Sequence, residues 1–194
     1  MAGRNKNFNE GEVIEKALNQ FWLKGYESTS TRDLATAMEI NYGSVYNSFT
    51  NKEELYLKSL DFATVSYIKM LEDIIYGAQD SIIGLKKLFI ELIEEKDDTI
   101  KKRGCFLGNT LIEFSDKNGA IKNKVEQKFF QLEKMFFRAI ECAKENHSLT
   151  TEINSDILSA SLLSLFQGLM VYRRSSNDLK TMQGIIDLNF KLFT

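Results

Sequence analysis

The segment from residue 30 to residue 54, STRDLATAMEINYGSVYNSFTNKEE, narrows the possible folds of this chain more than any other. It holds two short helix-forming stretches, Thr31 to Glu39 and Tyr42 to Ser48, and the second stretch has no charged side chain. The link between them is too short for anything but a tight turn. Two short helices joined in this way form the layout of a helix-turn-helix.

The lack of proline extends the helical expectation to the whole chain. None of the 194 residues is proline, whereas average usage of about 5% would give roughly ten. Because proline interrupts helices and marks loops, its absence is compatible with long helices joined by Gly, Asn and Ser turns. No segment shows the period-two alternation of a strand. We therefore predict an all-α fold of about nine helices.

The spacing of apolar residues places these helices along the chain. Val13, Ala17 and Phe21 form an i, i+4 row that predicts a first helix from about Asn9 to Leu23, which Gly25 ends. The hydroxyls from Ser28 to Thr31 can cap the second helix, and the acidic residues after Asn51 favour the start of a fourth. The later helices are predicted at Lys52 to Tyr76, Ser81 to Glu95, Gly104 to Ser115, Ala120 to Glu145, Asp156 to Arg174 and Leu179 to Phe193.

Several classes of protein are disfavoured by missing sequence features. No apolar stretch reaches the about 18 residues that cross a bilayer, residues 1–9 are too polar for a signal peptide, and only Cys105 and Cys142 can pair. We therefore expect a cytoplasmic protein without a membrane partner. The sole histidine, His147, has no second imidazole, and no glycine-rich phosphate loop is present, so we expect neither a metal nor a cofactor.

The third helix has an outer face suited to nucleic acid. With Val45 and Phe49 turned inward, the outer face carries short polar groups that suit base edges and phosphate oxygens: Asn41, Tyr42, Ser44, Asn47 and Ser48. Gly43 costs about 1 kcal/mol of helix propensity. It marks either a close approach of a helix or of the DNA backbone, or a harmless surface position.

A wider pattern covers about residues 8–60, and its positions are Ala17, Phe21, Gly25, Thr29, Leu34, Ala35, Gly43, Tyr46, Phe49, Lys52 and Glu53. This pattern resembles that of the TetR family of bacterial transcriptional repressors. The resemblance implies a helix-turn-helix DNA-binding domain over residues 6–66 and a regulatory and dimerisation domain over residues 67–194. It also implies that Thr31, Tyr46 and Lys52 contact phosphates and that the third helix faces the major groove. The full DNA-binding set is then Thr29, Ser30, Thr31, Asn41, Tyr42, Ser44, Tyr46, Asn47 and Lys52.

The charge of this region departs from that of a strongly basic DNA-binding domain. Residues 1–58 contain seven lysines and arginines against eight aspartates and glutamates, a balance of −1. Bulk attraction to phosphate is therefore weak. We predict modest affinity for each half-site, dependence on dimerisation and a small salt dependence.

Two further surfaces are candidates in the C-terminal part. Small residues at i, i+4 spacing permit close helix packing, so the helix from Asp156 to Arg174, together with the last helix, is a candidate dimer interface. The alternative is an ordinary core helix. The candidate interface residues are Leu158, Ala160, Leu162, Ser164, Leu165, Gly168 and Leu169.

The second surface is the segment RGCFLGNTLIEFS, residues 103–115, which resembles a segment of some TetR-family regulators that sense electrophiles or oxidants through its cysteine. Cys105 follows three cationic residues near a helix start, and both influences lower a thiol pKa. The alternative is that it packs as a small hydrophobe. The candidate effector or sensor residues are Cys105, Phe106, Asn109, Phe129, Phe166 and Gln167.

Three functions remain open at the level of residues. A helical enzyme would need Cys105 as nucleophile with His147 as base, yet nothing else marks a catalytic site. A protein-binding adaptor could use the same helix pair. The best supported hypothesis is a homodimeric transcriptional regulator and not an enzyme. We expect a repressor that binds a double-stranded DNA operator and dissociates when a small-molecule effector or an electrophile binds to it.

Overall fold

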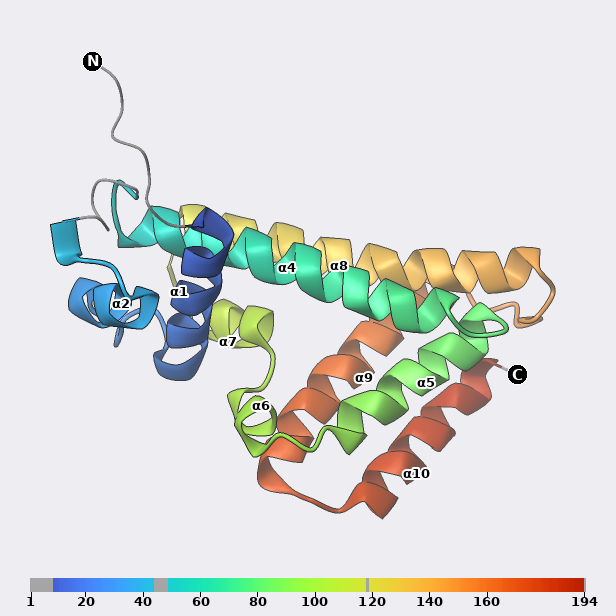
Figure 1. The fold of residues 1–194 in the computed structure, drawn as a ribbon. Coiled ribbons are helices and arrows are strands. Elements are labelled where there is room, and N and C mark those ends of the chain that lie inside the picture. The colour runs from blue at the N-terminus through green and yellow to red at the C-terminus, as the bar shows by residue number, and fades with distance from the viewer. Residues whose placement is uncertain (1–8, 44–48, 118, 194) are drawn as a thin grey trace. The chain divides into compact units, whose positions relative to one another are not determined.

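The structure is a computed structural model that describes residues 9–43, 49–117 and 119–193, and all regular structure in these ranges is helical. The all-α fold class is confirmed. The α-helices, shown in Figure 1, are α1 Glu10–Lys24, α2 Thr31–Met38, α4 Lys52–Tyr76, α5 Ser81–Glu94, α6 Asp98–Arg103, α7 Phe106–Glu113, α8 Ala120–Glu145, α9 Ser155–Ser175 and α10 Leu179–Phe190, and the 3-10 helix η1 Lys191–Phe193 follows.

The observed helices begin and end close to the predicted positions, and two segments differ from the prediction. Helix α6 was not predicted, because none of its residues is buried and a polar stretch shows no apolar period. It nevertheless has a regular start, where the Asp97 side chain accepts a hydrogen bond from Thr99 N at 2.8 Å. Of the predicted third helix, Tyr42 and Gly43 are helical, and Ser44 to Ser48 lie outside the described residues.

The chain forms two compact units. The N-terminal unit comprises residues up to Ser66 together with Asn109–Lys128, and the C-terminal unit comprises Tyr67–Gly108 and the residues from Phe129 onward. The predicted domains, residues 6–66 and 67–194, divide α4 at the same position. They assign residues 109–128 to the second domain, however, because a linear reading of sequence cannot show that this segment returns to the first.

The core of the N-terminal unit is built from the predicted rows of apolar residues. Val13, Ala17 and Phe21 of α1 are at most 4% exposed, and Leu34 of α2 is completely buried. Helix α1 packs against α2. Burying one large apolar side chain contributes about 1.5–3 kcal/mol, so these helices are held mainly by their shared apolar face.

In the C-terminal unit, α5 lies between α9 and α10 (Figure 1). Phe89, Phe136 and Phe166 are completely buried, and their ring centroids lie 6.1–6.4 Å apart. These rings therefore form packed core. Helix α9 is long and apolar enough to cross a membrane by length and composition alone, and its apolar stripe of Leu158, Leu162, Phe166 and Leu169 is buried inside the unit.

Candidate nucleic-acid interface

Helix α2 begins with a reciprocal pair of capping hydrogen bonds. The Ser30 hydroxyl accepts from Asp33 N at 3.1 Å, and the Asp33 carboxylate accepts from Ser30 N at 2.9 Å. Lys24 Nζ donates to the same carboxylate at 2.8 Å. The Lys24 ammonium first, and the Ser30 hydroxyl second, hold the pKa of Asp33 well below its ordinary value. Ser30, a predicted DNA-binding residue, is thus already used to begin the helix.

Thr29 has a structural role that excludes its predicted one. Its side chain is completely buried, and Oγ1 donates to Gly25 O at 2.6 Å. A side chain without exposed surface cannot contact DNA, so the prediction that Thr29 binds DNA is wrong. The hydroxyl instead closes the turn between α1 and α2.

Lys52 is partly committed to the same turn. Its ammonium donates to Tyr26 O at 3.0 Å and to Thr29 O at 3.1 Å, and it lies 4.1 Å from the centre of the Tyr26 ring. An ammonium has three N–H donors, so one remains for a phosphate. The side chain is half-buried, and a phosphate contact by Lys52 stays a prediction.

The exposed end of the helix pair carries the remaining described candidates. Helix α2 closes at Glu39, which has a left-handed backbone with φ of 57°, and the turn leads directly to Asn41 and Tyr42. Both are exposed, Tyr42 by 48%, and Thr31 is half-buried in the first turn of α2. The other three candidates, Ser44, Tyr46 and Asn47, lie outside the described residues.

Gly43 is not crowded by the part of the chain that the structure describes. A Cβ added there would lie 3.5 Å from the Asn41 side chain, an ordinary contact distance. The described residues therefore supply no neighbouring helix that requires glycine, which leaves the DNA backbone or an unconstrained surface position as its explanations.

One carboxylate from α7 holds the turn between α1 and α2. Glu113 accepts hydrogen bonds from Tyr26 N at 3.0 Å and Glu27 N at 2.8 Å. Gly25, with φ of +82°, provides the sharp backbone bend, and a Cβ there would lie 3.3 Å from the Glu113 carboxylate. Sequence reasoning missed Glu113, because its partners are backbone N–H groups 86 and 87 residues away.

Further contacts of α7 strengthen this attachment. The Tyr56 hydroxyl and the Thr110 hydroxyl share a buried hydrogen bond of 2.7 Å, and burial raises the pKa of Tyr56. The Phe114 ring, just beyond α7, packs edge-on against Tyr26 at 5.3 Å between centroids. The C-terminal half of α7 is therefore built into the N-terminal unit.

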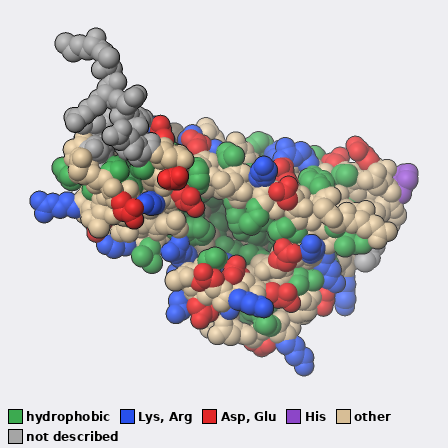
Figure 2. Space-filling model, in the orientation of Figure 1, with side chains coloured by type: hydrophobic (Ala, Val, Ile, Leu, Met, Phe, Trp, Pro, Cys, Tyr) green, Lys and Arg blue, Asp and Glu red, His purple; other side chains and the backbone are tan. Residues whose placement is uncertain are grey.

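The charged surface of this unit is mixed. Acidic and basic side chains are interspersed over it on the face shown in Figure 2. Three lysines are paired with carboxylates: Lys16 with Glu39, Lys24 with Asp33 and Lys58 with Glu10. Among the basic residues described between positions 9 and 58, only Arg32 and Lys52 form no ion pair. Arg32 is exposed in the first turn of α2, and sequence reasoning did not include it.

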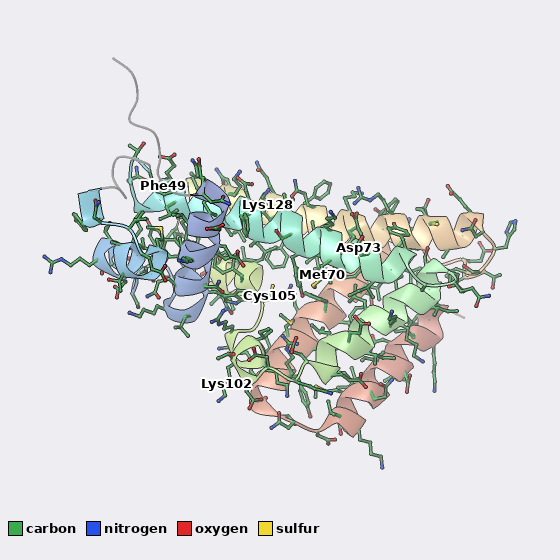
Figure 3. All side chains as sticks on the ribbon, viewed as in Figure 1. Phe49, Met70, Asp73, Lys102, Cys105 and Lys128 are labelled. Atoms are coloured by element: carbon green, nitrogen blue, oxygen red, sulfur yellow. The ribbon has the colours of Figure 1, made fainter. Side chains whose placement is uncertain are left out.

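Cys105, the candidate sensor, is buried just before α7. It is 8% exposed, and Sγ accepts from Gly108 N and from Gln167 Nε2, each at 3.4 Å. Burial raises the pKa of the Cys105 thiol, so the prediction of a lowered pKa is wrong: desolvation outweighs the hydrogen bonds from Gly108 and Gln167 and the charge of Arg173. Lys102 is exposed on the outside of α6, away from the thiol (Figure 3).

The other effector candidates are distributed between the units. Phe106 and Phe166 are buried, and Gln167 and Phe129 are half-buried, all in the C-terminal unit. Asn109 belongs to the N-terminal unit. Within this set, Gln167 Nε2 donates a hydrogen bond to Cys105 Sγ. The sequence analysis placed both residues in the candidate set, but nothing in the sequence indicated this contact.

The predicted interface residues of α9 divide between a buried and an exposed face. Leu158, Leu162 and Leu169 are at most 2% exposed, because they pack into the core of their own unit, and Leu165 is half-buried. The small residues of the predicted set lie on the exposed face of α9, with further apolar side chains beside them. The members of this face are Ile157, Ala160, Ser164, Gly168 and Val171.

Two family models match the chain in succession. The model described as "Bacterial regulatory proteins, tetR family" matches residues 13–58, and that described as "Tetracyclin repressor-like, C-terminal domain" matches residues 84–187. The first covers the helix pair and its flanking helices, and the second covers most of the C-terminal unit.

Individual proteins are similar over almost the whole chain. The transcriptional repressor DhaR of Mycobacterium sp. (strain GP1) is 23% identical over 92% of this chain and 89% of its own length. The repressor ComR of Escherichia coli (strain K12) is 24% identical over 98% and 91%. Among solved structures, a cysteine mutant of the TetR family regulator CifR, complexed with operator DNA, has a TM-score of 0.79 at 19% identity and covers 98% of this chain and 100% of its own.

Proposed function

This chain belongs to the TetR family of bacterial regulatory proteins, and we propose that it acts as a homodimeric repressor whose effector releases it from its operator. It is a helix-turn-helix DNA-binding transcriptional regulator and not an enzyme, in keeping with its family and its relatives. Repression is proposed by likeness to DhaR and ComR, which are named as repressors.

The exposed end of the helix pair carries the proposal for DNA contact. The capping pair of Ser30 and Asp33 begins α2, and the left-handed Glu39 ends it, so that Arg32 near the start of α2 and Asn41 and Tyr42 beyond its end are presented to solvent. A guanidinium suits a phosphate, and an amide and a phenol suit base edges and phosphate oxygens.

A second copy of the chain is the proposed partner of the exposed face of α9. Ala160, Ser164 and Gly168 allow close approach of another helix, and Ile157 and Val171 are 65% and 63% exposed. Large apolar side chains grouped with small ones on one helix face favour burial in an interface. Dimerisation would also bring together two weakly charged helix-turn-helix domains, which would compensate for the modest affinity expected of each domain for its half-site.

Release is proposed to act through α7, because this short helix begins in one unit and ends in the other. Its start is attached to Cys105 in the C-terminal unit, and its end carries Glu113, which holds the turn between α1 and α2. A ligand or a modification that displaces the Cys105 end would pull on the two hydrogen bonds of Glu113. The turn between α1 and α2 would then lose the carboxylate that holds it, and the affinity of the helix pair for the operator would fall.

Electrophoretic mobility shift with DNA from upstream of the chain's own coding sequence tests the proposal. The wild-type protein should form a complex that survives excess scrambled DNA, and Arg32→Ala and Tyr42→Ala should weaken it by about tenfold each. Lys87→Ala, which removes an exposed cation from α5, is the matched control and should bind normally. A complex that scrambled DNA removes equally well would contradict the proposal.

A further inference from the structure

Arg173 is a buried cation with an unused hydrogen-bond donor. It lies near the end of α9, is 5% exposed, and donates from Nη1 to Leu92 O at 2.5 Å. Its Nε is buried and has no acceptor among the residues that the structure describes. Buried donors are nearly always paired, because an unmet one loses its hydration without replacement. The unused donor therefore indicates a missing acceptor.

The charge of Arg173 is also not balanced by a direct partner. None of the described carboxylates forms an ion pair with it. Burial lowers the pKa of Arg173, whereas Tyr67 and Glu95 are close enough to favour its charged form without an ion pair. A buried guanidinium without a carboxylate is costly in a protein interior, so an anion that reached it would be strongly favoured.

A cavity gives access to this side chain. It has a volume of about 480 Å³, lies within the C-terminal unit, and is lined by Arg173 together with residues from α5, α6, α10 and the adjoining loops. Ile93 and Met182, at most 3% exposed, form an apolar part of the wall. Lys96 and Lys101, the latter paired with the exposed Asp98 at 3.6 Å, add positive charge, and this volume suits a small organic molecule.

We propose that this cavity binds a small organic carboxylate whose anionic end is held by Arg173 and whose apolar body rests on Ile93 and Met182. Three cationic and two acidic side chains line the cavity, a balance of +1 that matches one carboxylate better than a doubly charged phosphate. The planar guanidinium offers Nε and Nη2 along one edge, which matches the two oxygens of a carboxylate. This proposal rests on the proposed function, in which the carboxylate would be the effector of the regulator.

Isothermal titration calorimetry on the full-length protein tests the site directly. The probes are propionate, 3-phenylpropionate and octanoate, each compared with its neutral amide. At least one carboxylate with an apolar body should bind once per chain, and its amide should bind about tenfold or more weakly. Arg173→Met should weaken carboxylate binding by about tenfold or more, and Lys101→Gln should weaken it by a smaller factor.

The control variant is Arg174→Gln, which removes the adjacent but exposed guanidinium and should bind like the wild type. The proposal is overturned if no carboxylate of the set binds at millimolar concentration, if acid and amide bind equally, or if Arg173→Met binds as tightly as the wild type. Should Arg173→Met fail to fold, the acid and amide comparison and Lys101→Gln decide. Carboxylate binding without specific DNA binding would support this site and contradict the proposed function as a regulator. Specific DNA binding without carboxylate binding would support the proposed function and contradict this site.

Discussion

The side chains beside the turn between α1 and α2 serve the protein interior as well as its surface. Lys52 holds two carbonyls of this turn while keeping a third donor, and Ser30 caps α2 while remaining exposed. Thr29 is fully enclosed. A short polar residue near a helix-turn-helix therefore has two possible roles, and its burial decides between them. Residue type alone did not distinguish Thr29 from Ser30 or Thr31.

Replacing Thr29 by valine separates the structural role from a DNA-binding role. Valine has the same shape, but it leaves Gly25 O without the hydrogen bond of the hydroxyl. The free energy of unfolding should fall by about 1–2 kcal/mol, with operator affinity of the folded protein unchanged within about twofold. Chemical denaturation and fluorescence anisotropy measure the two effects. Thr36→Val, at an exposed position of α2, should leave both quantities unchanged. A large loss of operator affinity in Thr29→Val without a loss of stability would instead show that Thr29 contacts DNA.

The reactivity of Cys105 is a second prediction at the scale of one residue. Because burial raises the pKa of this thiol, the thiolate should form only above the usual pKa of about 8.5. In a Cys142→Ser background, the rate of alkylation by iodoacetamide should rise with pH to a midpoint above that value, and it should be slower than for free cysteine at pH 7. A midpoint below about 8.5 would instead show an activated sensor thiol in the resting protein.

At the scale of elements, α7 is the helix whose role the sequence concealed. Its range and its apolar face follow from spacing, and the segment Gly104 to Ser115 was predicted as a helix. Its attachment through Glu113 and Thr110 depends on contacts with residues more than fifty positions away. Helix periods show which face of an element is buried, but not which partner covers it. For the same reason, the sequence showed the apolar stripe of α9 but left open whether a second copy or its own unit covers it, and in the structure the leucines Leu158, Leu162 and Leu169 are buried inside their own unit.

Glu113 tests whether α7 holds the helix pair in position. Glu113→Ala removes both acceptors of Tyr26 N and Glu27 N, whereas Glu113→Gln keeps one carbonyl oxygen. The alanine variant should lose about 1–2 kcal/mol of unfolding free energy and bind operator more weakly, and the glutamine variant should lie between it and the wild type. Denaturant titration and anisotropy provide the readout. Glu126→Ala, at an exposed position of α8, should behave like the wild type, and equal results for all three variants would remove Glu113 from the mechanism.

The exposed face of α9 is tested by adding a charge to it. Gly168 has no neighbour within 4 Å of an added Cβ, so Gly168→Arg should fold normally. If this face pairs with a second copy, the arginine would be buried at the contact, and the mass measured by sedimentation should fall towards the 22.3 kDa of one chain. Glu91→Arg places a similar change on an exposed position of α5 and should leave the mass unaltered. A dimer that persists in Gly168→Arg would place the interface elsewhere.

At the scale of the whole molecule, the fold of the TetR family is combined with an N-terminal region whose net charge is close to zero. The fold class and the family were both accessible from sequence, because helix periods and the joint spacing of residues such as Gly25, Gly43 and Phe49 are local properties. The C-terminal chemistry was less accessible. The burial of Arg173 and its cavity result from the meeting of several helices, and no local motif marks such a site. The net charge of the N-terminal region can be counted from the sequence, whereas contacts between distant residues become visible only in the fold.

Anisotropy of labelled upstream DNA, titrated with the protein over a range of salt concentrations, tests the central claim most directly. The account predicts sequence-specific binding by two chains per site, with a small slope of log affinity against log salt because few basic side chains are unpaired. Scrambled DNA of equal length should bind far more weakly. Equal binding to both DNAs, or a steep salt slope that corresponds to many released counterions, would contradict the account of a weakly charged regulator that reads its operator in pairs.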